Sequence, residues 1–323
     1  MSKRYAIVSI GTNSTRLVLA DVEPDDPRIE LVRAVGTRIG EGLGEHGRLG
    51  DEPMQRTLDA IGQFQRAIRG HYVRLFAVAT SALRRGENGE AFGSRVQELL
   101  GVPLRVLSGE EEAAASYRGA LAALGTLRGE RVGVVDVGGG STEFASGDSS
   151  EPEKVISCEI GAVRLTEAVP ALAGRDATVD DAVVAQARSI AREALKPLTE
   201  CAAVERLALV GGSATTTAAI IRGRRTLLTA HSMTRADLQR TLGRLLSMQL
   251  EERKAIVGMK PQRADILPAG IIVLDTALEI VGLDQAVATT NDLLLGILLQ
   301  ERDAAGQRPP GPRASGTRRG FRP

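Results

Sequence analysis

Residues 4–17 read RYAIVSIGTNSTRL, and they align without a gap with residues 131–144, which read RVGVVDVGGGSTEF. Each copy contains an apolar run, a glycine-led turn with Ser-Thr, and a second apolar run. This pattern predicts a β-hairpin. Because the pattern occurs twice, we expect two similar halves, each beginning with such a hairpin.

The two turns carry residues suited to binding an anion. Glycine permits backbone conformations with positive φ, so several N–H groups can converge on one phosphate, and hydroxyl and amide side chains add donors. The predicted phosphate-binding residues are Gly11, Thr12, Asn13 and Ser14 in the first turn, and Gly138, Gly139, Gly140, Ser141 and Thr142 in the second. Steric needs alone explain a single glycine-rich turn, but the duplication favours a phosphate chain gripped from both sides.

Helices and strands alternate after each hairpin, which is typical of an α/β layer. Further strands are predicted at residues 29–35, 75–79, 104–107, 155–159 and 206–210, and helices from 53 and at 91–100, 110–124, 163–171, 179–200, 235–248, 263–281 and 292–302. A boundary near 126–130 gives domains at 1–127 and 128–302. The last helix, 292–302, is expected to pack back across the first domain.

A third Gly/Ser/Thr segment follows the predicted strand 206–210. Gly211, Gly212 and Ser213 lie where that strand leads into an apolar helix. The N-terminus of a helix favours an anion, because its free N–H groups and its dipole point toward the ligand. These three residues are therefore also predicted to bind phosphate.

The composition excludes several classes of protein. With 43% hydrophobic and 25% charged residues, the chain is expected to be a soluble globular protein. It has no Trp, three Tyr and five Phe, which leaves little for stacking the bases of a nucleic acid. No apolar run is long enough to span a membrane, and no secretory leader precedes the first strand. We expect a cytoplasmic protein without specific nucleic-acid or membrane partners.

Two cysteines and three scattered histidines offer neither a disulfide framework nor a zinc cluster. The segment 303–323 is predicted to be a disordered basic tail, since residues 308–323 hold five Arg and no acid. A solvated appendage and a loose polyanion contact both stay open for this tail. The oligomeric state stays open too, a homodimer included.

Seven motifs together resemble the exopolyphosphatase/guanosine pentaphosphate phosphohydrolase (Ppx/GppA) family, in its short two-domain form. They are IGTNSTRL at 10–17, ATSALR at 79–84 with Asn88, SGEEEA at 108–113, DVGGGSTE at 136–143, GAVRL at 161–165, GGSATT at 211–216 and RADILPAG at 263–270. The resemblance spans roughly residues 4–300. It implies an α/β fold of the actin-like ATPase (ribonuclease H-like) superfamily, with duplicated domains around a central phosphate-binding cleft.

The resemblance also implies roles for individual residues. Glu112 resembles the catalytic carboxylate, which would orient and deprotonate the attacking water. Asp136 and Glu143 resemble the acids that hold Mg²⁺, a hard cation that prefers carboxylate, phosphate and water oxygens. Arginines suited to clamping phosphate oxygens are Arg84, assigned to catalysis, and also Arg16 and Arg164. Acids at the start of a helix are also favoured by its dipole, so position alone does not assign Glu112.

Ser9 departs from the family pattern, which has Asp at this position, the counterpart of Asp136. Serine supplies no anionic ligand, so either the remaining acids suffice or activity is weakened. From the sequence we expect Ser9→Asp to raise turnover, unless the chain has compensated for the serine. Longer members of the family append further domains after the two seen in this sequence, so we expect a shorter substrate.

The leading hypothesis is an exopolyphosphatase that releases phosphate from the end of inorganic polyphosphate with Mg²⁺. A guanosine pentaphosphate (pppGpp) 5′-phosphohydrolase would use the same machinery, and the sequence does not separate the two. Ser9 motivates a different class, a non-catalytic protein that binds polyphosphate or the alarmone. A kinase of the same superfamily is the remaining alternative.

Overall fold

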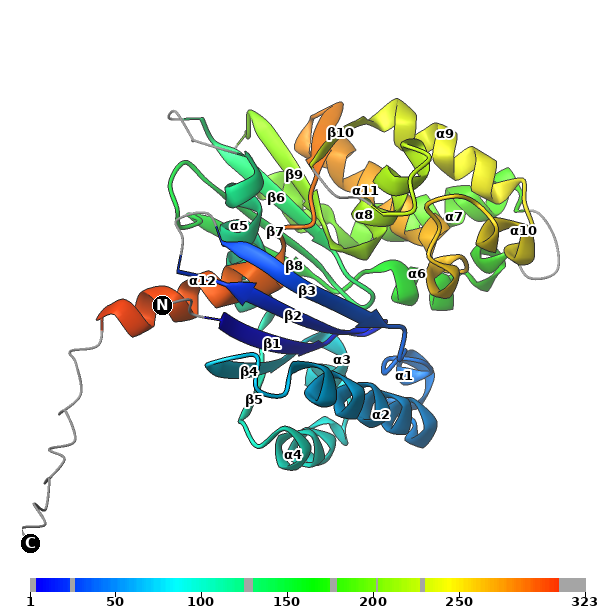
Figure 1. Cartoon of the computed structure of the whole chain (residues 1–323). Helices are drawn as coiled ribbons and strands as arrows, with labels where there is room; N and C mark the ends of the chain where they lie inside the picture. Colours follow the sequence, from blue (N-terminus) through cyan, green and yellow to red (C-terminus); the bar gives the residue numbers. More distant parts are fainter. Residues whose placement is uncertain are drawn as a thin grey trace, which may run out of the picture.

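The structure, a computed structural model, describes residues 4–23, 27–124, 130–174, 179–201, 203–226 and 230–307. Within these ranges the first sheet has the strand order β3-β2-β1-β4-β5 (Figure 1). Its strands are β1 (Arg4–Ile10), β2 (Thr15–Asp21), β3 (Arg28–Val35), β4 (Arg74–Ala79) and β5 (Leu104–Val106). The strands β1 to β3 form an antiparallel meander, and β4 continues the sheet parallel to β1. All five correspond to strands predicted from the sequence.

The second sheet repeats this plan and extends it, with the order β10-β11-β9-β6-β7-β8. Its strands are β6 (Val132–Val137), β7 (Thr142–Gly147), β8 (Lys154–Cys158), β9 (Arg206–Val210), β10 (His231–Thr234) and β11 (Gln285–Ala288). The hairpin β6–β7 is antiparallel, and β9 runs parallel to β6 as β4 does to β1. The predicted duplicated α/β fold is confirmed. The sequence analysis missed β10 and β11, because four residues are too few to show an alternating pattern.

The predicted helices are all present with bounds shifted by a few residues, together with three short helices that were not predicted. The helices are α1 (Leu43–His46), α2 (Asp51–Ile68), α3 (Ser81–Arg85), α4 (Gly89–Leu100), α5 (Gly109–Leu124), α6 (Ala162–Ala168), α7 (Asp181–Ala194), α8 (Gly211–Ile221), α9 (Arg235–Leu246), α10 (Leu250–Lys254), α11 (Leu267–Val281) and α12 (Leu293–Gln307), with 3₁₀ turns at Pro170–Ala173, Lys196–Glu200 and Pro261–Arg263. Three predicted helices ran across a proline and were too long, because Pro170, Pro197 and Pro268 remove a backbone donor and start a new turn.

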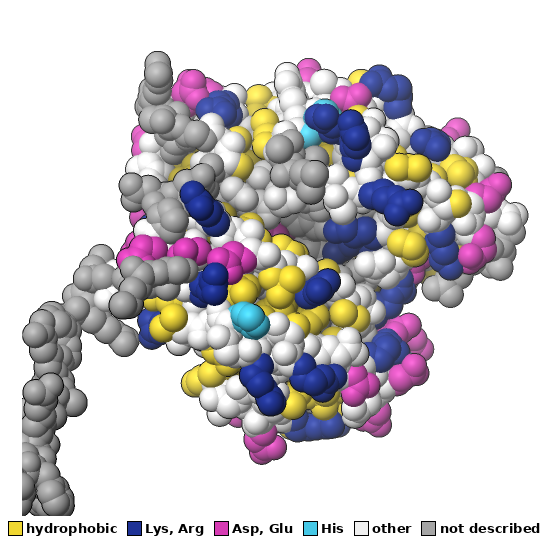
Figure 2. Space-filling model, in the orientation of Figure 1, with side chains coloured by type: hydrophobic (Ala, Val, Ile, Leu, Met, Phe, Trp, Pro, Cys, Tyr) yellow, Lys and Arg dark blue, Asp and Glu magenta, His cyan; other side chains and the backbone are white. Residues whose placement is uncertain are grey.

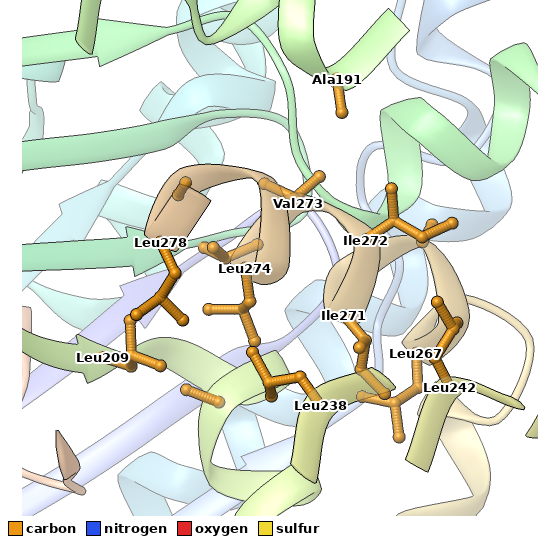
Figure 3. Packing of buried hydrophobic residues seen from close by; sticks show 14 of the residues in the cluster. Ala191, Leu209, Leu238, Leu242, Leu267, Ile271, Ile272, Val273, Leu274 and Leu278 are labelled. Carbon is orange, nitrogen blue, oxygen red and sulfur yellow. The ribbon is translucent and has the colours of Figure 1, made fainter. Parts of the chain in front are cut away.

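Helix α11 lies at the centre of the second core. Its side chains Leu267, Ile271 and Leu274 pack among Leu238 of α9 and Leu209 of β9 (Figure 3). Residues 267–278 are all buried, so the helix is covered on every side. Even so, none of the described helices is long and apolar enough to cross a membrane.

Helices α5 and α12 each pack on the sheet of the other half. From α12, Leu294 and Ile297 pack against Ile7 in the first sheet. From α5, Ala113 and Tyr117 pack against strands of the second sheet, Val132 and Val134 among them. The predicted domain boundary between residues 127 and 128 falls in the gap at 125–129, outside the described residues. Helix α12 also runs to Gln307, so residues 303–307, expected in the tail, are helical.

Helices α5 and α12 touch each other at a pair of glycines. A Cβ on Gly119 would lie 2.1 Å from the carbonyl oxygen of Asp292, and one on Gly296 would lie 1.8 Å from that of Ala115. No larger residue fits at either position without moving backbone. The crossing therefore brings the first turn of α12 close to the middle of α5, between the two sheets.

Candidate active site

The two hairpin turns have the same backbone geometry and meet in space. The N–H of Gly11 donates to the carbonyl of Ser14 at 3.0 Å, and that of Gly138 donates to the carbonyl of Ser141 at 3.0 Å. A Cβ on Gly139 would lie 2.9 Å from the Cβ of Thr12. The structure therefore brings together the predicted phosphate-binding residues of both turns.

The third predicted loop is the first turn of α8. Gly211, with φ of +86°, starts the helix, and a Cβ there would lie 2.6 Å from Oδ1 of Asp136. A Cβ on Gly212 would lie 2.0 Å from Cζ of Arg263. Gly211 needs glycine because of its positive φ, whereas a side chain at Gly212 would displace the Arg263 guanidinium. The N-terminus of α8 thus lies between an acid and a guanidinium.

Several polar atoms around these loops are buried without a hydrogen-bond partner among the described residues. They are Asn13 Oδ1, Ser81 Oγ, Ser213 Oγ and Thr216 Oγ1. Ser81 approaches the second turn, because a Cβ on Gly140 would lie 2.7 Å from its hydroxyl oxygen. A buried polar atom left unpaired costs about 1–3 kcal/mol. Such atoms around converging turns fit a site that binds a polar ligand.

The Thr142 side chain does not fit the predicted phosphate contact. Its hydroxyl donates to the carbonyl of Ile160 at 2.6 Å, and the residue is fully buried. Thr15, its counterpart in the first hairpin, likewise shares a 2.7 Å hydrogen bond with Thr37. Both threonines therefore fix the flank of a turn to a neighbouring segment.

Glu112 lies in the first turn of α5 and is buried. Arg84 Nη1 donates to its Oε1 at 2.6 Å and to the carbonyl of Leu107, also at 2.6 Å. Burial raises the pKa of Glu112 to about 7, although the Arg84 hydrogen bond and charge act in the opposite direction. A carboxyl group with a pKa near neutrality is suited to accepting a proton at physiological pH.

Asp136 and Glu143 lie directly opposite each other on β6 and β7. Ser116 donates to Asp136 Oδ2 at 2.6 Å, and Ser157 donates to Glu143 Oε1 at 3.0 Å. Burial raises the pKa of Asp136 to about 6. The pKa of Glu143 rises well above its usual value, because of burial and then the charges of Glu112 and Asp136. The three predicted acids therefore act on one another within one site.

The Asp136–Glu143 pair fits a magnesium ion that receives most of its ligands from water and substrate and not from the protein. In the described part of the chain, no three His, Cys, Asp or Glu side chains are arranged to hold a metal together. Mg²⁺ is commonly held by one or two carboxylates, with waters and substrate phosphates completing its shell. A cation between these acids would also offset the cost of burying two like charges.

A group of cations lies beside the first turn, and the sequence analysis named Arg16 alone from it. Arg16 Nη1 forms an ion pair with Asp292 Oδ2 at 2.6 Å, and Arg38 contacts both Asp265 oxygens at 2.8 Å. Arg263 Nη2 donates to Ser14 Oγ at 3.4 Å. On the face shown in Figure 2, Lys and Arg side chains are scattered over both parts of the molecule, and some lie beside the hollow between them.

Burial and neighbouring positive charges disfavour the charged form of two cations in this region, Arg263 and Lys260. Burial lowers the pKa of Arg263 to about 10, with further lowering by Arg16 and Arg38. Burial lowers the pKa of Lys260 to about 8, with further lowering by Arg263 and Arg16. Within the described residues no carboxylate forms an ion pair with Arg263. A bound anion such as phosphate would stabilise both cations.

The sequence offered one signal for these missed residues. Arg263 opens the motif RADILPAG that was quoted for the family resemblance, but no role was assigned to it. Arg38 and Lys260 lie in segments without a distinctive pattern, and only the fold brings them to the turn. Arg164, named as a further clamp, instead pairs with Glu159 at 2.6 Å.

Comparisons with known proteins show matches along most of the chain. Residues 20–301 match the model of the Ppx/GppA phosphatase family. Exopolyphosphatase 2 of Mycobacterium tuberculosis is 34% identical, over 92% of this chain and 98% of that protein. The guanosine-5′-triphosphate,3′-diphosphate pyrophosphatase of Vibrio vulnificus is 29% identical, over 88% of this chain and 56% of that protein.

Solved structures give the same result. The Ppx/GppA family member of Aquifex aeolicus is 27% identical and has a TM-score of 0.78, over 95% of this chain and 100% of that chain. An exopolyphosphatase of Cytophaga hutchinsonii is 25% identical and has a TM-score of 0.85, over 94% of this chain and 98% of that chain. The similarity therefore extends over nearly the whole of this chain.

Proposed function

Because the chain belongs to the Ppx/GppA phosphatase family, we propose that it is an exopolyphosphatase that hydrolyses the terminal phosphoanhydride of inorganic polyphosphate with Mg²⁺. The observation that carries this proposal is the Arg84–Glu112 pair beside the opposed acids Asp136 and Glu143. A base, a fixed guanidinium and a pair of acids are the parts that phosphoryl transfer to water requires.

The residues of the chain divide the work of the reaction. The two hairpin turns and the start of α8 bind the terminal phosphate through backbone N–H groups and hydroxyls. Glu112 accepts a proton from the attacking water. The water oxygen forms a bond to the terminal phosphorus, the bridging P–O bond breaks, and orthophosphate leaves together with a chain one unit shorter.

The cations act on the charge of the substrate. Arg84 is held by Glu112 and the Leu107 carbonyl, so its guanidinium needs little reorganisation when it meets a phosphate oxygen. Arg16 lies near Asp136, and Arg263 donates a hydrogen bond to Ser14 in the first turn. Mg²⁺, held by Asp136 and Glu143, would neutralise charge on the transferring phosphoryl group.

Two observations favour polyphosphate over a nucleotide as the proposed substrate. The 34% identical relative named as an exopolyphosphatase is matched along 98% of its length, whereas the chain spans 56% of the relative named as a pyrophosphatase. The cations Arg16, Arg38, Lys260 and Arg263 also form a cluster of positive charge suited to a run of phosphates. The relative named as a pyrophosphatase nevertheless keeps pppGpp as the second candidate substrate.

Phosphate release from polyphosphate and from pppGpp, measured side by side with Mg²⁺, tests the proposal. We expect a higher kcat/KM on polyphosphate, and no release with the Glu112→Gln variant. Faster release from pppGpp would make the second candidate the function. Tight binding of polyphosphate without release, across several divalent metals, would instead indicate a non-catalytic binding protein.

A further inference from the structure

Ser9 and Arg16 occupy the positions in the first hairpin that Asp136 and Glu143 occupy in the second. Each pair lies directly opposite across its antiparallel strands, so the two side chains share one face of the sheet. In the first hairpin that face also carries Ile7, which packs against α12. Where the second hairpin offers two acids, the first therefore offers a hydroxyl and a cation.

An acid reaches this position from the other end of the chain. Asp292, just before α12, accepts a hydrogen bond from Arg16 Nη1 at 2.6 Å across a separation of 276 residues. Its other oxygen, Oδ1, accepts from the N–H of Leu294 at 3.1 Å, and 9% of its side chain is exposed. The backbone of Asp292 is held in turn by its contact with Gly119 of α5.

The charges of this pair extend to the proposed metal site. Asp136 lies close enough that the charge of Asp292 raises its pKa and that of Arg16 lowers it. The same helix α5 contacts both groups, since Ser116 donates to Asp136 and Gly119 lies against Asp292. Without Asp292, the Arg16 cation would stand uncompensated beside the acids that are to hold Mg²⁺.

We propose that Asp292 is a positioning residue that takes the place of the acid missing at Ser9: it fixes Arg16 and offsets its charge beside Asp136. The inference deepens the proposed function, because it concerns the metal site of the same reaction. It also changes the expectation for Ser9. With Asp292 already paired to Arg16, a carboxylate at position 9 adds little to the native protein.

Removing Asp292 and removing Arg16 are expected to change Mg²⁺ affinity in opposite directions. Asp292→Asn leaves Arg16 uncompensated and weakens Mg²⁺ binding by about tenfold, whereas Arg16→Gln leaves Asp292 free and strengthens it. Damage to the fold would weaken binding in both variants, so the opposite signs identify the electrostatic role. Asp303→Asn, which removes an exposed acid from α12, serves as the control.

A second pair of variants tests the replacement directly. Ser9→Asp alone should change Mg²⁺ affinity by less than about threefold, but in the Asp292→Asn background it should restore most of the lost affinity, because it lies opposite Arg16. Isothermal titration of the full chain with MgCl₂, without substrate, measures the native protein and every variant, and circular dichroism checks that they are folded.

Three results would overturn the inference: native Mg²⁺ affinity in Asp292→Asn, weaker binding in Arg16→Gln, or no restoration in the double variant. Should Asp292→Asn fail to fold, the sign of the Arg16→Gln effect decides. Because no substrate is present, the result is independent of the proposed function. A protein that never hydrolyses polyphosphate can still show this pattern, and an active one can lack it.

Discussion

Arg84 and Glu112 form a 2.6 Å ion pair that joins α3 to the first turn of α5. The amide of Glu112→Gln still offers Arg84 an oxygen acceptor but cannot accept the proton of the attacking water. We therefore expect kcat to fall by at least about a hundredfold while polyphosphate binding stays nearly unchanged. Steady-state kinetics and titration with polyphosphate measure the two effects.

The matched control for this variant is Glu111→Gln, which changes the neighbouring acid. Glu111 is exposed and contacts Arg105 and the N–H of Ser108, so its variant should keep native turnover. If Glu112→Gln retained a turnover rate within about tenfold of the native protein, Glu112 would not be the base.

Asp136→Asn and Glu143→Gln should each raise the Mg²⁺ concentration needed for half-maximal activity. Each variant keeps the shape of the side chain, including the acceptor for Ser116 or Ser157, and removes one charge beside the cation. The shift should be about tenfold or more, and it is measured by the rate of phosphate release against MgCl₂. Unchanged metal dependence in both variants would place the ion elsewhere.

The lowered pKa of Lys260 predicts that substrate affinity falls at alkaline pH. Burial lowers its pKa to about 8, so it is a cation below that pH and neutral above it. One positive charge is thus lost from the group that meets the polyanion, and kcat/KM should fall above about pH 8. In Lys260→Arg the residue stays charged, and the fall should move to higher pH.

A pH profile of kcat/KM checks this expectation, with Lys254→Arg as the control. Lys254 pairs with Glu251 on the short helix α10, and its replacement should leave the profile unchanged. A native profile that is flat between about pH 7 and 9.5 would remove Lys260 from substrate binding.

The crossing of α5 and α12 predicts a large difference between two glycine variants. Gly296→Ala places a methyl group 1.8 Å from the Ala115 carbonyl oxygen, so the helices must separate. We expect the free energy of unfolding to fall by about 2 kcal/mol or more. Gly243→Ala on α9 meets nothing within 4 Å and should be neutral, or stabilise by up to about 1 kcal/mol.

Urea denaturation of both variants measures the difference. Equal stability in the two variants would mean that α12 shifts away from α5 at no cost. The result would then contradict the close approach of Gly119 and Gly296 described above.

Local patterns predicted the parts of the site that lie within one segment. The repeated hairpin, with its glycine turn, was visible because apolar runs and turn residues are encoded next to one another. Residue roles at Glu112, Asp136 and Glu143 came from the family resemblance and remain predictions, although the structure brings the three acids together.

Long-range pairs could not be read from the sequence. Arg16 and Asp292 are 276 residues apart, and Arg38 and Asp265 are 227 apart. Nothing in either local pattern identifies the partner, because charged residues are usually solvated. Such pairs depend on how the two halves pack, which a single sequence does not encode locally.

The exchange of α5 and α12 has a consequence for how the protein unfolds. Helix α5, which follows the first sheet in the chain, covers an apolar face of the second sheet, and α12, which follows the second sheet, covers one of the first. The arrangement resembles two subunits that swap an element. Neither half can therefore lose its structure without stripping a helix from its neighbour. The thermal transition should be a single cooperative step, and a fragment cut between the two sheets should not fold alone, because it would leave one sheet face open to water.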